Sequence, residues 1–232
     1  MSEELLGNAT WTDIAAAAAS VRSVLAVPIG SCEQHGPHLP LDTDTRIACA
    51  VATGLAVALP RVVVTPPIGI SGSGEHAGFA GTLSIGTAAL ELVLIELARS
   101  ADWCAGVVFV NGHGGNHSAM LAATSLLVAE GRAVLAWAPS IAGGDAHAGR
   151  TETSLMLAIA PDAVRLDAMQ PGRTEPLSEL LPVLRLSGVA HLSPNGVLGD
   201  PTGATAQEGT ALLRALVDDL IASVAAWLQH TP

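Results

Sequence analysis

Short apolar runs alternate with longer amphipathic stretches along most of the chain. The short runs are rich in Val, Leu and Ile, a pattern typical of parallel strands that are buried on both faces. We expect these strands at residues 23–29, 62–65, 106–110 and 133–137. The longer stretches carry the spacing and end signals of helices, and we expect helices at residues 45–59, 87–99, 117–129 and 205–229. Residues 166–203 are rich in Pro and Gly, and there we expect loops and an irregular hairpin.

Strands and helices alternate without a long polar linker, which predicts one doubly wound α/β domain over residues 1–232. In such parallel sheets, ligands bind beyond the carboxyl ends of the strands. Two histidine-containing segments, 30–44 and 111–117, each follow a predicted strand directly. We therefore expect the two segments to meet at the same edge of the sheet.

The composition excludes several classes of function. The net charge is −11, whereas nucleic acids and anionic membranes require clustered cations, so we expect neither as a partner. The chain contains no lysine, which excludes a Schiff-base or phosphate-loop lysine. Its three cysteines lack CxxC spacing and predict neither a disulfide framework nor a cysteine-rich zinc site.

No apolar run approaches the roughly 20 residues that cross a bilayer. Residues 1–4 are acidic, unlike a secretory signal, and we expect a cytoplasmic protein.

The first histidine-containing segment offers three metal-binding side chains. Glu33 and His35 are two residues apart, so in extended backbone they point to the same side. Asp44 falls where the next predicted helix begins, and it is either a helix cap or a ligand. Carboxylate and imidazole together suit Zn, Fe or Mn, and a carboxylate can bridge two ions. A polar loop with capping residues is the alternative interpretation.

Three further segments carry candidate site residues. His113 lies among glycines that let the backbone approach a ligand closely, and the amides of Gly114 and Gly115 are candidates for oxyanion binding. His147 suits a proton shuttle, because its ordinary pKa lies near neutrality. Glu152 precedes an apolar helix, so it either completes a capping box or acts at the site. The small and polar segment 71–84 predicts a substrate-binding loop, and its candidate substrate-binding residues are Ser73, Glu75 and His76.

Together these segments resemble the creatininase family (creatinine amidohydrolase-like metallohydrolases). The matching stretches are residues 31–40 with Asp44, 73–76 with 81–82, 111–116, 147–154 and 196–206. The resemblance implies a three-layer α/β/α fold with a mostly parallel central sheet. It also implies a centre of two divalent ions (Zn, Fe or Mn), with Glu33 and His113 on one ion, His35 on the other and Asp44 bridging. Creatinine hydrolysers have a further glutamate ligand where this chain has Gly115, so either Glu152 supplies the carboxylate or the second ion is weak or absent.

The resemblance also suggests a substrate. Creatinine hydrolysers carry a tryptophan shortly before the histidine that matches His147. The corresponding residues of this chain, 141–144, include no aromatic side chain, which argues against creatinine as the substrate. The compact, alanine-rich, lysine-free chain is more similar to the family branch found in mycofactocin biosynthesis. Members of that branch are peptidases that release a modified C-terminal dipeptide from a precursor peptide. Hydrolysis of a small cyclic amide or a formamide is the alternative, and the resemblance implies a homo-oligomer.

Two other classes of function compete with the metal-dependent amidohydrolase. A cysteine hydrolase would use Cys32 as nucleophile, with His35 or His147 as base. Against it, a free cysteine is usually a small hydrophobic residue. A non-catalytic, metal-stabilised scaffold is the third interpretation, which Gly115 favours because creatinine hydrolysers of the family have a glutamate ligand at this position.

Overall fold

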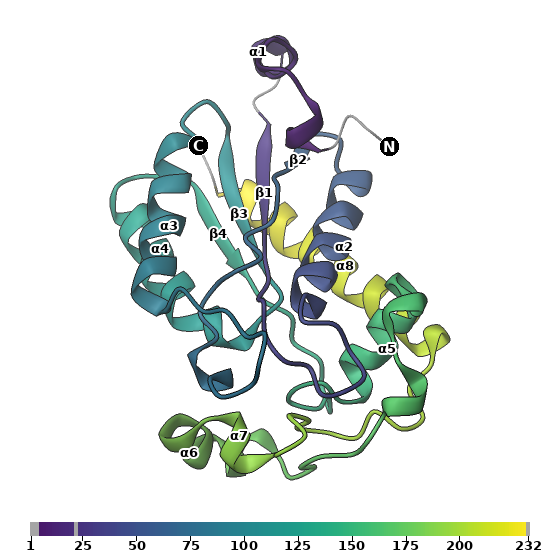
Figure 1. Cartoon of the computed structure of the whole chain (residues 1–232). Helices are drawn as coiled ribbons and strands as arrows, with labels where there is room; N and C mark the ends of the chain where they lie inside the picture. Colours follow the sequence, from purple (N-terminus) through teal and green to yellow (C-terminus); the bar gives the residue numbers. More distant parts are fainter. Residues whose placement is uncertain (1–4, 21–22, 231–232) are drawn as a thin grey trace.

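Four parallel strands form the centre of the computed structural model, which describes residues 5–20 and 23–230 (Figure 1). The strands are β1 (Val24–Ile29), β2 (Val62–Val64), β3 (Gly106–Asn111) and β4 (Val134–Trp137), in the order β2-β1-β3-β4. β1 pairs with β3 along its whole length. The acidic residues 1–4, on which the expectation about a secretory signal rests, lie outside the described residues. Among the described helices, none has the length and apolar character needed to span a membrane.

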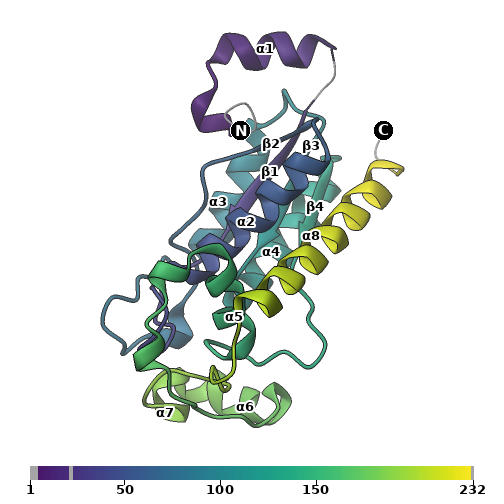
Figure 2. The same cartoon turned by 90° about the vertical axis from the view of Figure 1, so that its right-hand side faces the viewer.

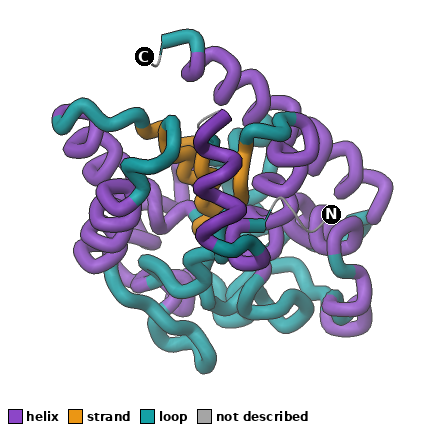
Figure 3. Tube along the Cα trace, turned by 90° about the horizontal axis from the view of Figure 1, so that it is seen from above, coloured by secondary structure: helices purple, strands orange, loops and turns teal. Residues whose placement is uncertain are grey.

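Helices cover both faces of this sheet (Figures 1 and 3). One face packs against α2 (Thr43–Ala58), α5 (Arg150–Ile159) and α8 (Ala206–Leu228), and the other against α3 (Thr87–Ser100) and α4 (His117–Ala129). Successive strand side chains alternate between the two cores, since Val24 and Ala26 belong to the first and Leu25 and Val27 to the second. The predicted three-layer α/β/α fold is confirmed.

Local signals account for several helix ends. Pro60 disfavours helical backbone at the residue before it, and α2 ends at Ala58 with Leu59 extended. At the start of α8, the Thr205 side chain accepts a hydrogen bond from the backbone N–H of Glu208. α2 begins at Thr43, two residues before the expected position, so Asp44 lies in its first turn.

The expectation of an irregular hairpin within 166–203 is wrong. This region contains the short turn η5 (Leu166–Ala168) followed by two helices, α6 (Leu177–Ser187) and α7 (Val189–Leu192). Pro182 lies inside α6, and Gly188 separates the two helices with φ +73°. Because proline and glycine usually indicate loops, the sequence pattern does not predict these helices. Leu180, Val189, Leu192 and Leu198 form a small core of their own, and this packing stabilises the helices.

α6 and α7 lie beyond the carboxyl ends of the strands. The opposite end of the sheet carries α1 (Trp11–Ser20), as Figure 2 shows. The remaining elements are single turns: η1 (Leu6–Asn8), η2 (Gly74–His76), η3 (Gly114–Asn116) and η4 (Pro161–Ala163). The helix pair therefore covers the edge of the sheet at which the candidate residues gather.

Candidate metal centre

Two glycines bring the loops after β1 and β3 against the first turn of α2. A Cβ on Gly30 would lie 2.2 Å from Oγ1 of Thr45, and one on Gly112 would lie 2.4 Å from the backbone oxygen of Asp44. Only glycine permits such close approach of backbone to backbone. The two loops and the start of α2 therefore meet, as expected from the parallel sheet.

Four predicted ligands converge at this meeting point. Nε2 of His35 lies 3.0 Å from Oδ1 of Asp44, and Nδ1 of His113 lies 3.2 Å from Oδ2 of the same carboxylate. Nε2 of His113 lies 3.2 Å from Oε2 of Glu33. All four side chains are buried. Asp44 therefore stands between two imidazoles, although these residues come from segments far apart in the chain.

Asp44 does not cap its helix. The N-cap of α2 is Asp42, and no side-chain capping hydrogen bond is formed there. Oδ2 of Asp44 instead accepts a hydrogen bond of 2.8 Å from Oγ of Ser31. The Asp44 side chain is thus oriented toward the histidines rather than toward the helix amides.

Glu152 does not complete a capping box, because the N-cap of α5 is Gly149, which has no side chain to cap the helix. Glu152 lies in the first turn of α5, where one carboxylate oxygen accepts a hydrogen bond of 2.6 Å from the N–H of Ala148. The same oxygen lies 3.9 Å from Nε2 of His35. Burial raises the pKa of the Glu152 carboxyl to about 7, although the charge of His35 opposes that shift.

The electrostatics of His35 favour a cation at this position. Nδ1 lies 3.1 Å from the backbone oxygen of Glu33, so a neutral ring that donates its proton there directs the Nε2 lone pair at Asp44. Burial lowers the pKa of His35, but the carboxylates of Asp44, Glu152 and Glu33 outweigh burial and raise the pKa to about 9. Either a proton or a metal ion is required between the ring and Asp44.

The Glu33 carboxylate provides a test of whether the residues fit a metal. Its side chain is 0% exposed, and neither of its oxygens receives a hydrogen bond from any described residue. A buried carboxylate without hydrogen bonds is costly unless a cation compensates its charge. Three groups of side chains place ligand atoms within 4.8 Å of one another: Glu33, Asp44 and His113; His35, Asp44 and Glu152; and Glu33, His35 and His147. The residues therefore fit a bound metal, and Asp44 is common to two of the groups.

Gln34 is a site residue that the sequence did not reveal. Its side-chain nitrogen lies 2.9 Å from Nδ1 of His76, 3.0 Å from Nε2 of His147 and 3.0 Å from the carbonyl oxygen of Gly196. The backbone oxygen of Gln34 also lies 2.9 Å from Nε2 of His147. A glutamine between two predicted ligands carries no distinctive signal, because its partners come from distant segments.

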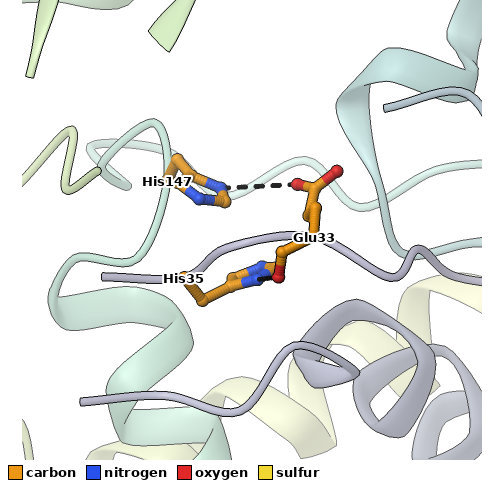
Figure 4. Close-up of side chains that lie close together, drawn as sticks. All are labelled: Glu33, His35 and His147. Atoms are coloured by element: carbon orange, nitrogen blue, oxygen red, sulfur yellow. Dashed lines mark hydrogen bonds and ion pairs between the residues drawn. The ribbon is translucent and has the colours of Figure 1, made fainter. Parts of the chain in front are cut away.

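His147 lies over the centre beside Glu33 and His35 (Figure 4). Its Nδ1 is 3.8 Å from Oε1 of Glu33, and its ring lies against that of His35, with centroids 4.3 Å apart and the planes tilted by 42°. Burial and the neighbouring His35 and His76 hold the pKa of His147 well below its ordinary range. His147 is therefore neutral at pH 7.

Asn116 was also overlooked, and it connects three loops. Its side-chain nitrogen donates to the carbonyl of Gly30 at 3.0 Å and to Oδ1 of Asn111 at 3.1 Å. Its side-chain oxygen accepts from the N–H of Gly72 at 3.2 Å. Asn116 thereby holds the loops after β1 and β3 against the predicted substrate-binding loop.

A cavity of about 520 Å³ opens over the centre. Its polar floor contains acids and imidazoles: Asp44, Glu75, His76, His113, His147 and Glu152. Its apolar wall comes largely from the helix pair: Leu177, Leu181, Leu184, Val189 and Leu198. Gly114 and Gly115 line the cavity as well, whereas Ser73 is fully buried beside it and does not line it.

The structure does not place Cys32 at the cavity. Its sulfur contacts the carbonyl oxygen of Gly81 at 3.7 Å, and Cys32 is not among the residues that line the space. A nucleophile must reach the substrate carbonyl, so the arrangement of the described residues does not favour a cysteine hydrolase.

Solved structures define the class of this fold. A creatininase variant with one tryptophan replaced by phenylalanine superimposes with a TM-score of 0.83 at 26% identity, covering 99% of this chain and 100% of that chain. Other solved creatininase structures include a Zn-Zn type and a manganese form. The family model described as creatinine amidohydrolase matches residues 7–224, and the chain belongs to the creatininase family.

Two relatives show where the chain stands in this family. The mycofactocin precursor peptide peptidase of Mycolicibacterium smegmatis is 53% identical over 215 residues, which are 90% of this chain and 87% of that protein. The creatinine amidohydrolase of Pseudomonas putida is 29% identical over 252 residues, with 93% of this chain and 94% of that protein covered. The resemblance that the motifs suggested is confirmed at the level of the family and of its peptidase branch.

Proposed function

We propose that residues 1–232 form one metal-dependent peptidase domain that releases a modified C-terminal dipeptide from the mycofactocin precursor peptide. The decisive observation is the buried Glu33 carboxylate, which receives no hydrogen bond from any described residue and stands 3.2 Å from both His76 and His113. Such a carboxylate supports a bound cation beneath the cavity. The 53% identity to a peptidase of this precursor supports the substrate.

The ligands in this proposal are the residues that converge in the structure. Glu33 and His113 would hold one ion, His35 and Glu152 the other, and Asp44 would bridge them. Zinc and manganese are both compatible with imidazole and carboxylate ligands, as is iron. When bound, such ions lower the pKa of water from about 15.7 toward 7 and polarise an amide carbonyl.

His147 moves the proton in this proposal. Because its pKa is low, the ring is neutral at pH 7 and begins as a base. Its Nε2 lies beside the backbone oxygen of Gln34, so Nδ1 is the atom directed at the centre. Nδ1 accepts a proton from the attacking water and delivers it to the departing nitrogen. Gly114 and Gly115 begin η3 at the cavity wall, where their amides can stabilise an oxyanion.

The cavity favours a peptide over a small cyclic amide. A space of about 520 Å³ with a wall of leucines suits apolar peptide side chains better than it suits creatinine or a formamide. Hydrolysis of such small amides is the second candidate, because the family includes a creatinine amidohydrolase that is 29% identical.

The test compares substrates and metal states. The modified precursor peptide, its unmodified form, creatinine and a formamide are incubated with the protein, and products are identified by mass spectrometry. We expect cleavage of the modified peptide, loss of activity after chelation, and recovery with Zn²⁺ or Mn²⁺. Full turnover by a verified metal-free sample would contradict the proposal. If metal is bound and no amide is cleaved, the non-catalytic scaffold becomes the better interpretation.

We also propose that the chain forms a homo-oligomer. Trp11 of α1 is 81% exposed, and Leu92 and Leu121 on the outer helices α3 and α4 are 59% and 61% exposed. Large apolar side chains on a surface often mark contacts between subunits. Light scattering after size-exclusion chromatography should give a mass that is a multiple of 23.4 kDa, and a monomer would contradict this proposal.

A further inference from the structure

Gly115 leaves room for a side chain that comes from another loop. A Cβ built on Gly115 would lie 2.2 Å from Oε1 of Glu75, 2.4 Å from Nε2 of His113 and 2.6 Å from the backbone oxygen of Gly72. The backbone of Gly115 does not have the positive φ that requires glycine. A side chain at this position would therefore collide with the Glu75 carboxylate, with the His113 ring and with the backbone of Gly72.

Glu75 reaches this space from η2, on the segment between β2 and α3. Its Oε1 lies 3.3 Å from Nε2 of His113, and its side chain is 28% exposed and lines the cavity. Nε2 of His113 also lies 3.2 Å from Oε2 of Glu33 and 3.0 Å from the backbone oxygen of Gly72. Two carboxylates from different loops thus approach the same nitrogen of a predicted ligand.

The charge of the centre favours including Glu75 in it. Four carboxylates surround the histidines: Glu33, Asp44, Glu75 and Glu152. Within the described part of the chain, the ion pairs recorded for these four residues are all with histidines, which are neutral when they bind metal. Two divalent cations would balance four carboxylates.

We propose that Glu75 is a metal ligand of this centre, rather than a substrate-binding residue, and that it binds the ion held by Glu33, Asp44 and His113. The inference rests on the proposed metal-dependent function. It assigns the carboxylate that Gly115 lacks to a different loop, and it leaves Glu152 on the His35 side of Asp44.

The first experiment measures metal binding directly. Metal-free wild type, Glu75→Gln and Glu179→Gln are titrated with Zn²⁺ in the presence of a competing chelator, and circular dichroism confirms folding. Glu179 is an exposed glutamate of α6, so it controls for the loss of one charge. We expect two ions in the wild type and in Glu179→Gln. In Glu75→Gln we expect one ion to bind at least about 100-fold more weakly. Glutamine keeps a hydrogen-bond acceptor for His113, so a merely structural role would leave Zn²⁺ affinity unchanged.

The second experiment places a side chain at Gly115. Gly115→Glu should also weaken Zn²⁺ binding, because its Cβ collides with Glu75, with His113 and with the backbone oxygen of Gly72. Unchanged binding by the folded Glu75→Gln variant overturns the assignment while the metal centre stands. Absence of Zn²⁺ binding by the wild type overturns the proposed function itself.

Discussion

The two sides of the cavity are built in different ways. The rim, which comprises residues 30–44 and 111–117, is anchored to the central sheet, and its polar side chains are mostly buried and connected by hydrogen bonds. The cap, which comprises α6 and α7, has a small separate core around Leu180 and Leu192 and leaves Leu186 86% exposed. Groups held in fixed positions suit chemistry, whereas a separately packed cap can change without disturbing them. We therefore expect variants of the buried rim carboxylates and histidines to alter turnover and metal binding, and variants of the cavity-lining cap residues to alter substrate affinity.

The largest effect is expected at Asp44, the carboxylate shared by both candidate ion sites. Asp44→Asn should lower kcat/KM at least about 10³-fold, or about 4 kcal/mol, and should reduce the bound metal. Asp42→Asn is the matched control, because Asp42 bonds Arg46 at the surface. Metal analysis and peptide cleavage measure the two effects. An Asp44→Asn protein with full metal content and turnover would show that the rim is not the reactive side.

The next effect is expected at His147, the proposed proton carrier. His147→Ala should lower kcat about 10²-fold or more, because general acid–base catalysis contributes that much, and should change KM little. His191→Ala, an exposed histidine of α7, should leave both parameters near those of the wild type. A His147→Ala variant that loses only substrate affinity would assign this residue to binding.

Metal binding should depend on pH through the rim histidines. Without metal, the carboxylates of Asp44, Glu152 and Glu33 outweigh burial and raise the pKa of His35 to about 9, and the pKa of His113 also lies well above its ordinary value. Both rings are then protonated at pH 7 and must release their protons to a metal. Zn²⁺ affinity should fall about tenfold per pH unit for each proton released as the pH decreases below these values. Calorimetry in buffers of different ionisation enthalpy counts the protons, and binding without proton release would refute the expectation.

The smallest effect is expected in the cap. Leu181 lines the cavity, so Leu181→Ala should raise KM for the peptide about tenfold, since an apolar contact of this size is worth about 1–3 kcal/mol, and should leave kcat and metal content unchanged. Leu186→Ala on the same helix is the control, because Leu186 does not line the cavity. If Leu181→Ala reduces kcat and metal content instead, the cap and the rim are not independent.

Much of the fold and part of the centre follow from local patterns. The four strands consist of runs of β-branched and other apolar residues, and α2 and α4 end where Pro60 and Gly131 predict. The order of strands and helices also implies that segments 30–44 and 111–117 share an edge, because parallel strands direct their carboxyl ends to the same side. The sequence by itself therefore determined the sheet and the neighbourhood of Glu33, His35, Asp44 and His113.

Tertiary structure alone decided the remainder, because it depends on contacts between distant residues. α6 and α7 form around a core that also includes Leu198, and no local signal predicts that packing. The Gln34 side chain contacts both His147 and Gly196, and Gly196 lies 162 residues after Gln34 in the chain. Glu75 occupies the space beside Gly115 from a different loop. Periodicity reports which side chains are buried together, whereas the position of a single carboxylate or amide is set by the whole three-dimensional arrangement.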